Sequence, residues 1–207
     1  MQHERLFVYG NLHSIEVRDD AEKLQRFVGH ASVYYDGTPG TEYRVRNVVE
    51  RIMPGAFDRA IHDDVVGLFN HDPNYVLGRT SSGTMTLEAD GKGLRYEIMP
   101  AQDSTRHRDL MVDIKRGDVT GASFGFIPGD TSVAREGDTT VKYIRSVKML
   151  RDVGPVTFPA YSGASAMMRS KEYDEMLLRE AEEFQRKQRE EEALRLRRKR
   201  RMLLMGL

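Results

Sequence analysis

Short runs of β-branched and aromatic residues, separated by turn signals, fill most of the chain up to about Met168. The turn signals are Asp-Gly at 36–37 and 90–91, Pro-Gly at 39–40 and 128–129, and Ser-Gly at 82–83. Several short strands at this spacing are typical of a β-sandwich or a barrel. The expected strands cover residues 26–35, 43–51, 65–69, 84–88, 94–99, 119–127, 141–150 and 153–158.

Two helices are predicted to interrupt the strands. The first covers residues 54–61 and opens with a proline, which suits a first helical turn. The second covers residues 105–116, where Asp103 or Ser104 can cap the N-terminus and Gly117 ends the helix. The expected fold class is therefore α+β, one domain with a few helices built on a barrel-like, mostly antiparallel sheet.

The composition changes after Met168, where Glu, Arg, Lys, Leu and Met dominate and glycine and proline are absent until the last two residues. This pattern predicts a long charged helix from about residue 171 to 201. An apolar stripe marks only its first half, at Tyr173, Leu177, Ala181 and Phe184. The helix is otherwise so polar that we expect it to project from the core as a docking or packaging element. The sequence thus divides into a body, residues 1–168, and a charged helical tail, residues 169–207.

Composition excludes several classes of protein. Lysine plus arginine and aspartate plus glutamate each total 32, so no net charge draws the whole chain to nucleic acid. The absence of cysteine excludes a disulfide framework, thiolate zinc sites and a cysteine nucleophile. No apolar run is long enough for a signal peptide or a membrane span. We therefore expect a soluble, intracellular protein without a membrane partner.

Residues 121–125, Gly-Ala-Ser-Phe-Gly, match the G-x-S-x-G pattern of a nucleophile elbow. An α/β-hydrolase is nevertheless excluded. Its elbow needs a helix directly after the serine, whereas Phe-Ile-Pro-Gly follows at 126–129. That fold also places its histidine after the serine, whereas the last histidine here is His107.

Ser123 remains a candidate nucleophile if its base comes from earlier in the chain, because a triad is defined by geometry and not by order. His71 has the best setting of the six histidines, since it follows an apolar strand at a turn and would be held rigidly there. Asp152 lies at the edge of an apolar run, where pairing with a histidine would explain a carboxylate. The small residues around Ser123 would let a substrate backbone approach the hydroxyl.

Simpler interpretations stay open on the residues alone. Ser123 can serve packing, His71 can cap a turn, and Asp152 can pair with Arg151 or Arg145. A metal-dependent hydrolase would instead use residues 62–64 (His-Asp-Asp) with residues 71–72 (His-Asp). The absence of an H-E-x-x-H or similar spacing argues against that reading, so no metal or cofactor is expected.

The order of motifs resembles the caudoviral prohead serine protease family, distant relatives of the herpesvirus assembly protease. The resemblance spans about residues 26–165, nearly the whole body, and does not cover the tail. The matching stretches are 27–35 (FVGHASVYY), 52–57 (IMPGAF), 68–72 (LFNHD), 77–79 (LGR), 91–94 (GKGL), 119–126 (VTGASFGF) and 152–161 (DVGPVTFPAY).

The resemblance implies a herpesvirus-protease-like fold in which His71 and Ser123 are catalytic. It suggests Asp152 as the third member, although the family usually has glutamate followed by Val-Ser there, and this chain has Asp152 followed by Val153 and Gly154. The herpesvirus relatives use a second histidine, so His30 is the alternative. The implied biology is a protease packaged in the procapsid, within the host cytoplasm, that cleaves scaffold and major capsid proteins and itself. The relatives also imply a homodimer.

Two other functions compete with this one. A non-catalytic capsid-assembly protein would retain the fold and use the charged helix to bind scaffold protein. The tail, with 12 basic and 9 acidic residues from Arg169 onward, ends in a basic run at 195–201 that offers a nucleic-acid site. The upstream glutamates and the lack of aromatic residues favour a solvated helix end instead.

Overall fold

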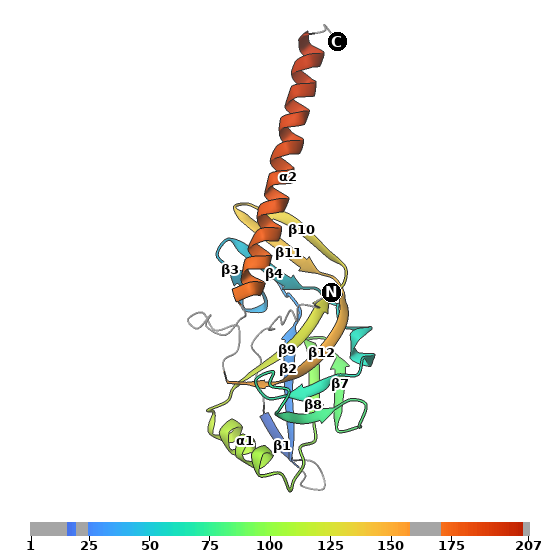
Figure 1. The fold of residues 1–207 in the computed structure, drawn as a ribbon, viewed down its shortest axis with the longest axis vertical. Coiled ribbons are helices and arrows are strands. Elements are labelled where there is room, and N and C mark those ends of the chain that lie inside the picture. Colours follow the sequence, from blue (N-terminus) through green and yellow to red (C-terminus); the bar gives the residue numbers. More distant parts are fainter. Residues whose placement is uncertain (1–15, 20–24, 158–170, 205–207) are drawn as a thin grey trace.

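The computed structural model describes residues 16–19, 25–157 and 171–204. Within these ranges the chain forms three four-stranded sheets and two α-helices (Figure 1). The helices are α1 (Thr105–Arg116) and α2 (Lys171–Leu204), with 3₁₀ turns at Pro39–Thr41 and Ala60–His62. No helix in the described part of the chain is long and apolar enough to cross a membrane.

Each sheet combines strands that are distant in sequence. The first sheet has the order β1 (Glu16–Asp19), β2 (Gln25–Val33), β8 (Gly93–Ile98), β7 (Met85–Ala89). The second has the order β10 (Thr131–Glu136), β11 (Thr139–Ile144), β4 (Val48–Ile52), β3 (Tyr43–Val45). The third has the order β6 (Val76–Arg79), β5 (Val66–Leu68), β12 (Val147–Val156), β9 (Gly121–Pro128).

Most neighbouring strands are antiparallel, and only the pairs β4–β11 and β5–β12 are parallel among the described strands. The predicted α+β class with a mostly antiparallel sheet and a long C-terminal helix is therefore confirmed. The described strands form three four-stranded sheets, so the barrel-like arrangement expected from the sequence does not close into a complete barrel.

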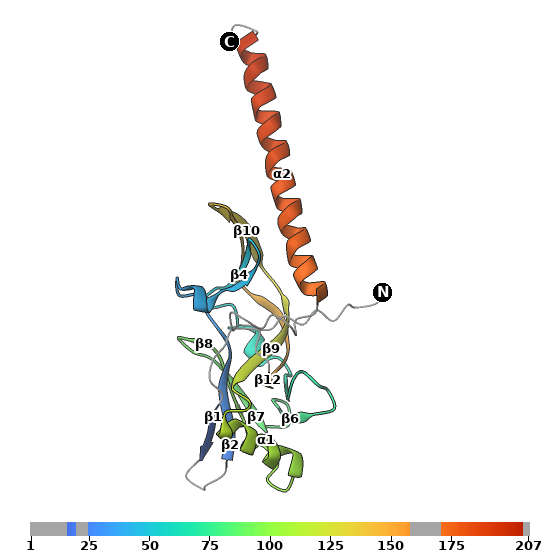
Figure 2. The ribbon, with the colours of Figure 1, turned by 90° about the vertical axis from the view of Figure 1, so that its left-hand side faces the viewer.

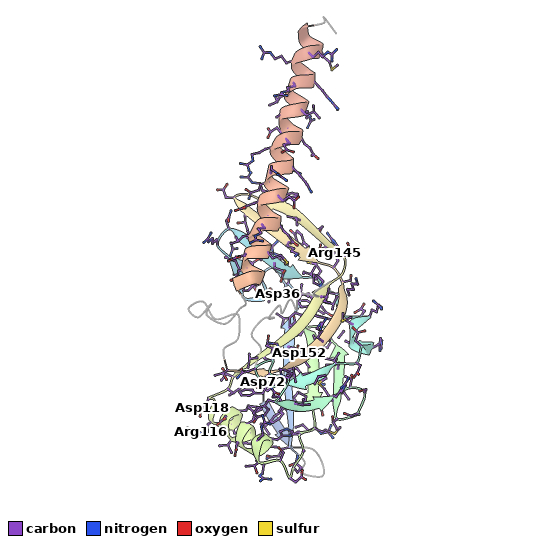
Figure 3. The ribbon with its side chains drawn as sticks, in the orientation of Figure 1. Asp36, Asp72, Arg116, Asp118, Arg145 and Asp152 are labelled. Atoms are coloured by element: carbon purple, nitrogen blue, oxygen red, sulfur yellow. The ribbon has the colours of Figure 1, made fainter. Side chains whose placement is uncertain are left out.

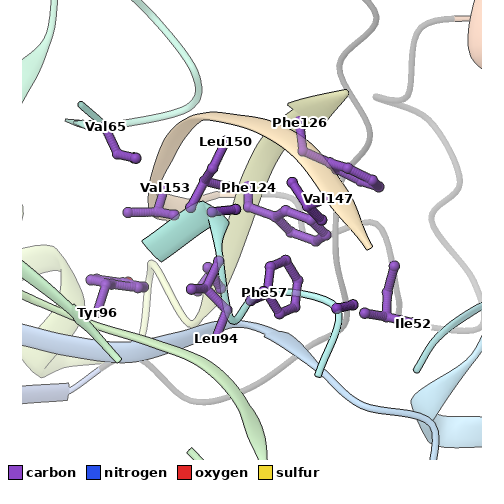
Figure 4. Packing of buried hydrophobic residues seen from close by; sticks show 14 of the residues in the cluster. Ile52, Phe57, Val65, Leu94, Tyr96, Phe124, Phe126, Val147, Leu150 and Val153 are labelled. Atoms are coloured by element: carbon purple, nitrogen blue, oxygen red, sulfur yellow. The ribbon is translucent and has the colours of Figure 1, made fainter. Parts of the chain in front are cut away.

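Aromatic and aliphatic side chains fill the space between β9, β12 and the first sheet (Figure 4). Phe124 stacks on Phe126 with ring centroids 4.7 Å apart, and Phe57 meets Phe124 edge-on at 5.5 Å. Leu94 and Tyr96 of β8 are fully buried in the same cluster. Burial of such side chains contributes about 1.5–3 kcal/mol each, and it fixes β9 and β12 as a rigid support for the site.

The helix predicted over residues 54–61 is wrong. This segment forms successive turns, in which Ala56 N–H donates to the Met53 carbonyl and Asp58 N–H to the Gly55 carbonyl, before the short 3₁₀ turn. Gly55 has a φ of 84°, outside the helical region, so a helix cannot propagate through it. The segment still buries Phe57 in the core.

The predicted helix over residues 105–116 is confirmed with its end signals. The Ser104 hydroxyl accepts a hydrogen bond from the His107 backbone N–H at 3.4 Å. Gly117 takes the left-handed conformation, with a φ of 81°, at the C-terminal cap. Leu110, Met111 and Ile114 are buried, so one face of α1 joins the core.

The first part of α2 packs against the second sheet and does not project from the body as predicted (Figures 1 and 2). Leu177 and Ala181 are buried in the main core, where Leu177 is 1% exposed. Polar contacts also connect the helix to the second sheet. Lys142 Nζ of β11 lies 2.6 Å from the Glu180 carboxylate, and the Tyr43 hydroxyl of β3 donates to Asp174 at 2.9 Å. The prediction was wrong for this part of the helix because it followed the polar composition of the whole segment and not its apolar stripe. The sequence of the helix also does not show its polar partners, Lys142 and Tyr43, which lie on strands distant in the chain.

The remainder of α2 extends beyond the sheets (Figure 2). From residue 186 to 202 every side chain is exposed, including Leu194 at 50%. This half carries the basic run 195–201 and is the part of the tail that fits the predicted projecting helix.

Candidate active site

Ser123 lies in the middle of β9, a strand whose residues from Gly121 to Phe126 are all buried. Its side chain has no exposed surface. A hydroxyl buried in an apolar strand needs a hydrogen-bonding partner. That partner is a ring nitrogen of His71, 52 residues earlier in the chain.

His71 lies in the turn that follows β5. The turn is closed by a hydrogen bond of 3.0 Å from Asp72 N–H to the Phe69 carbonyl. Its two central residues, Asn70 and His71, have φ values of 53° and 57°, the signs of a type I′ turn. Asparagine tolerates this conformation, but the second position normally requires glycine. A histidine held there costs about 1–3 kcal/mol, and backbone strain of this kind is common at functional sites.

The structure brings Ser123, His71 and Asp152 into one chain of hydrogen bonds. His71 Nε2 lies 2.9 Å from the Ser123 Oγ, and His71 Nδ1 forms a short contact with the Asp152 Oδ2. Because an ionised carboxylate can only accept, Nδ1–H donates to Asp152 and Nε2 accepts from the serine hydroxyl. This is the arrangement in which a serine can lose its proton to an imidazole.

Asp152 lies inside β12, with only 3% of its surface exposed (Figure 3). The sequence predicts a strand ending before Asp152, whereas β12 runs through it to Val156. Asp152 is opposite Gly125 of β9 and beside Val66 of the parallel β5. The strand can continue through a buried carboxylate because Asp152 bonds to His71, which lies in the turn after the neighbouring β5.

Gly154 lets β12 and β5 come close together beside the site. It lies opposite Ser123 in the β9–β12 ladder. A Cβ atom at Gly154 would lie 2.0 Å from the carbonyl oxygen of Leu68, the last residue of β5. The two strands can therefore take this spacing only with glycine at position 154.

His30, the alternative third member, bonds elsewhere. Its Nε2 lies 2.7 Å from Asp90 Oδ2, in the turn between β7 and β8. Partial burial acts to raise the pKa of Asp90, but hydrogen bonds from His30 and from the backbone N–H groups of Gly93 and Lys92 hold that pKa below its ordinary value. The contact that His71 Nδ1 makes is with Asp152 and not with His30.

The residues of the metal interpretation have other partners. Asp64 forms a bidentate ion pair with Arg79, and Asp63 accepts from the Leu150 backbone N–H at 3.0 Å. Across the described ranges, no three His, Asp or Glu side chains are grouped so as to hold a metal ion.

A family model described as caudovirus prohead serine protease matches residues 13–179. The chain belongs to this family. No curated protein and no solved structure matches it. The family match reaches beyond the predicted limit of about residue 165 and includes the first turns of α2, in agreement with the packing of Leu177 on the core.

The residues that hold the His71 turn in place are not among the sequence-predicted site residues. Asn70 hydrogen-bonds to Thr157, just beyond the end of β12. Both residues lie in stretches that carry the family resemblance, 68–72 and 152–161, but an asparagine at the start of a turn is too common to indicate by itself what it bonds to.

Proposed function

We propose that this prohead protease is a serine endopeptidase with Ser123 as nucleophile, His71 as general base and Asp152 as the residue that orients the imidazole. The observation that supports the proposal most is the continuous chain of hydrogen bonds from Ser123 through His71 to Asp152. These three side chains come from β9, the turn after β5, and β12, so the fold itself assembles them.

In the first half of the proposed reaction, Ser123 Oγ attacks the scissile carbonyl carbon while His71 Nε2 takes its proton. Asp152 accepts from Nδ1–H throughout, which fixes the tautomer and stabilises the imidazolium that forms. The tetrahedral intermediate collapses when His71 gives the proton to the leaving amine, and an acyl-enzyme remains on Ser123.

In the second half, water attacks the acyl-enzyme and gives its proton to His71 Nε2. The carboxylic acid product leaves as the proton returns to Ser123 Oγ. Neither half requires a metal or an organic cofactor. Ser123 has no exposed surface in this structure, so groups around the hydroxyl have to move when a substrate carbonyl approaches.

The proposed substrates are the scaffold protein and extensions of the major capsid protein inside the assembling procapsid, together with the protease itself. The family supports a role in phage maturation. We further propose that the exposed half of α2, residues 186–202, binds scaffold protein, because a helix with no packed face is available to a partner.

Co-expression with the scaffold and major capsid proteins tests the substrates. Intact masses of all products are compared between the wild type and Ser123→Ala. The proposal expects shortened scaffold, capsid or protease chains only with the wild type. Equal processing by both forms contradicts the role of Ser123, and full-length products with an otherwise active wild type contradict the choice of substrates.

A further inference from the structure

Asn70 ties the His71 turn to the strand that carries Asp152. Its backbone N–H donates to the Pro155 carbonyl at 3.0 Å. Its side-chain Oδ1 accepts from Thr157 N–H at 2.8 Å, and its Nδ2–H donates to Thr157 Oγ1 at 3.1 Å. The side-chain amide of Asn70 therefore donates and accepts at Thr157, just beyond β12, and its backbone N–H bonds to Pro155 within β12.

These bonds act where the regular pairing of the two strands has ended. In the β5–β12 ladder, Asp152 pairs with Val66 and Val153 with Gly67. After Leu68 the chain turns away to place His71 over the carboxylate. The ladder therefore fixes Asp152 on one side of the His71–Asp152 contact, and the Asn70 bonds fix the turn on the other side.

The residue type fits this task. Asparagine adopts a positive φ more readily than other residues that have a Cβ atom, as the turn requires. It also carries both a donor and an acceptor, and Thr157 uses both. Glycine would keep the turn but lose the amide, and aspartate would keep the acceptor but lose the donor.

We infer that Asn70 is a positioning residue, which holds the His71 imidazole in line between Asp152 and Ser123. It acts through the two hydrogen bonds between its side chain and Thr157, which we call the Asn70 clamp. The side chain of Asn70 is exposed and its hydrogen bonds go to β12 and Thr157, so it acts through the turn and not on the substrate. This inference rests on the proposed function of the triad.

Asn70→Gly tests the clamp because it preserves the turn and removes only the amide. Asn74→Gly is the matched control: Asn74 is exposed in the same loop, and its N–H and Nδ2–H bond to Asp72 within the loop. We expect kcat of Asn70→Gly to fall about 10- to 100-fold with KM unchanged, since displacing a catalytic group by 1 Å can cost about 100-fold. Asn74→Gly should match the wild type, and Asn70→Asp should recover part of the loss.

Proton NMR supplies a readout that does not depend on turnover. In a Ser123→Ala background, the His71 Nδ1–H bonded to Asp152 should give a resolved downfield signal. The clamp predicts that this signal broadens or disappears in Asn70→Gly and persists in Asn74→Gly. A persistent signal, or an unchanged kcat in Asn70→Gly, overturns the inference. A wild type without Ser123-dependent activity refutes the proposed function instead, and the NMR comparison still decides the clamp.

Discussion

The backbone of Gly154 passes directly against the carbonyl group of Leu68, so that a Cβ atom at position 154 would lie 2.0 Å from the Leu68 oxygen. The contact lies two residues after Asp152 and three residues before His71. It therefore sets the spacing between β12 and β5 at the place where the carboxylate reaches the imidazole.

Gly154→Ala is expected to force β12 away from β5. The added Cβ atom would meet the Leu68 backbone, which cannot move aside as a flexible side chain can. We therefore expect the free energy of unfolding to fall by about 1–3 kcal/mol. Labelling of Ser123 by a fluorophosphonate should also slow at least tenfold. Thermal denaturation and the labelling rate measure the two effects.

Gly40→Ala is the control for that substitution, because a Cβ atom at Gly40 would meet nothing within 4 Å. It should change neither quantity. A Gly154→Ala protein that labels as fast as the wild type would show that the spacing of these strands does not govern the triad.

Asp152→Asn should separate the two candidates for the third member. An amide would hold the His71 ring without stabilising the imidazolium, so kcat should fall by on the order of 10⁴. His71→Ala should cost more, on the order of 10⁶. His30→Ala should retain the activity of the wild type, because His30 bonds to Asp90. Peptide hydrolysis by the three purified variants checks this order, and a loss in His30→Ala with full activity in Asp152→Asn would reverse the assignment.

The local patterns predicted most strands and α1, because alternation, a capping serine and a glycine stop lie within a few residues of one another. They did not predict that β12 passes through Asp152, since the partner that makes burial of that carboxylate favourable, His71, lies 81 residues away. The positive φ of His71 was equally hidden, because an Asn-His pair lacks the glycine that signals such a turn. The order of the motifs predicts Ser123 and His71 as a catalytic pair. The 2.9 Å between His71 Nε2 and Ser123 Oγ follows only from the fold.

Asp90→Asn tests the structural role of the His30 contact. The pKa of Asp90 is lowered in the folded chain, so its charged form stabilises the fold above the unfolded pKa of about 3.9, and this contribution is lost as the pH falls through the lower folded pKa. We expect Asp90→Asn to be less stable than the wild type by about 1 kcal/mol at pH 7, and this difference in stability to shrink as the pH falls. Urea denaturation at several pH values measures it. A difference that widens as the pH falls would contradict this account.

Leu177 and Leu194 provide a matched pair on α2, since one is 1% and the other 50% exposed. Leu177→Ala should lower the free energy of unfolding by about 2–5 kcal/mol, as for a buried leucine. Leu194→Ala should stay within about 0.5 kcal/mol of the wild type. Equal effects in urea denaturation would mean that the first half of α2 does not belong to the folded body.

The site of fluorophosphonate labelling in the purified chain decides whether Ser123 is the activated nucleophile. Mass spectrometry of the digested product should find one adduct, on Ser123, in the wild type. His71→Ala should lose that adduct while it keeps the fold, because the hydroxyl then lacks the base 2.9 Å away. An adduct on another serine, or undiminished labelling of Ser123 in His71→Ala, would contradict the proposed triad.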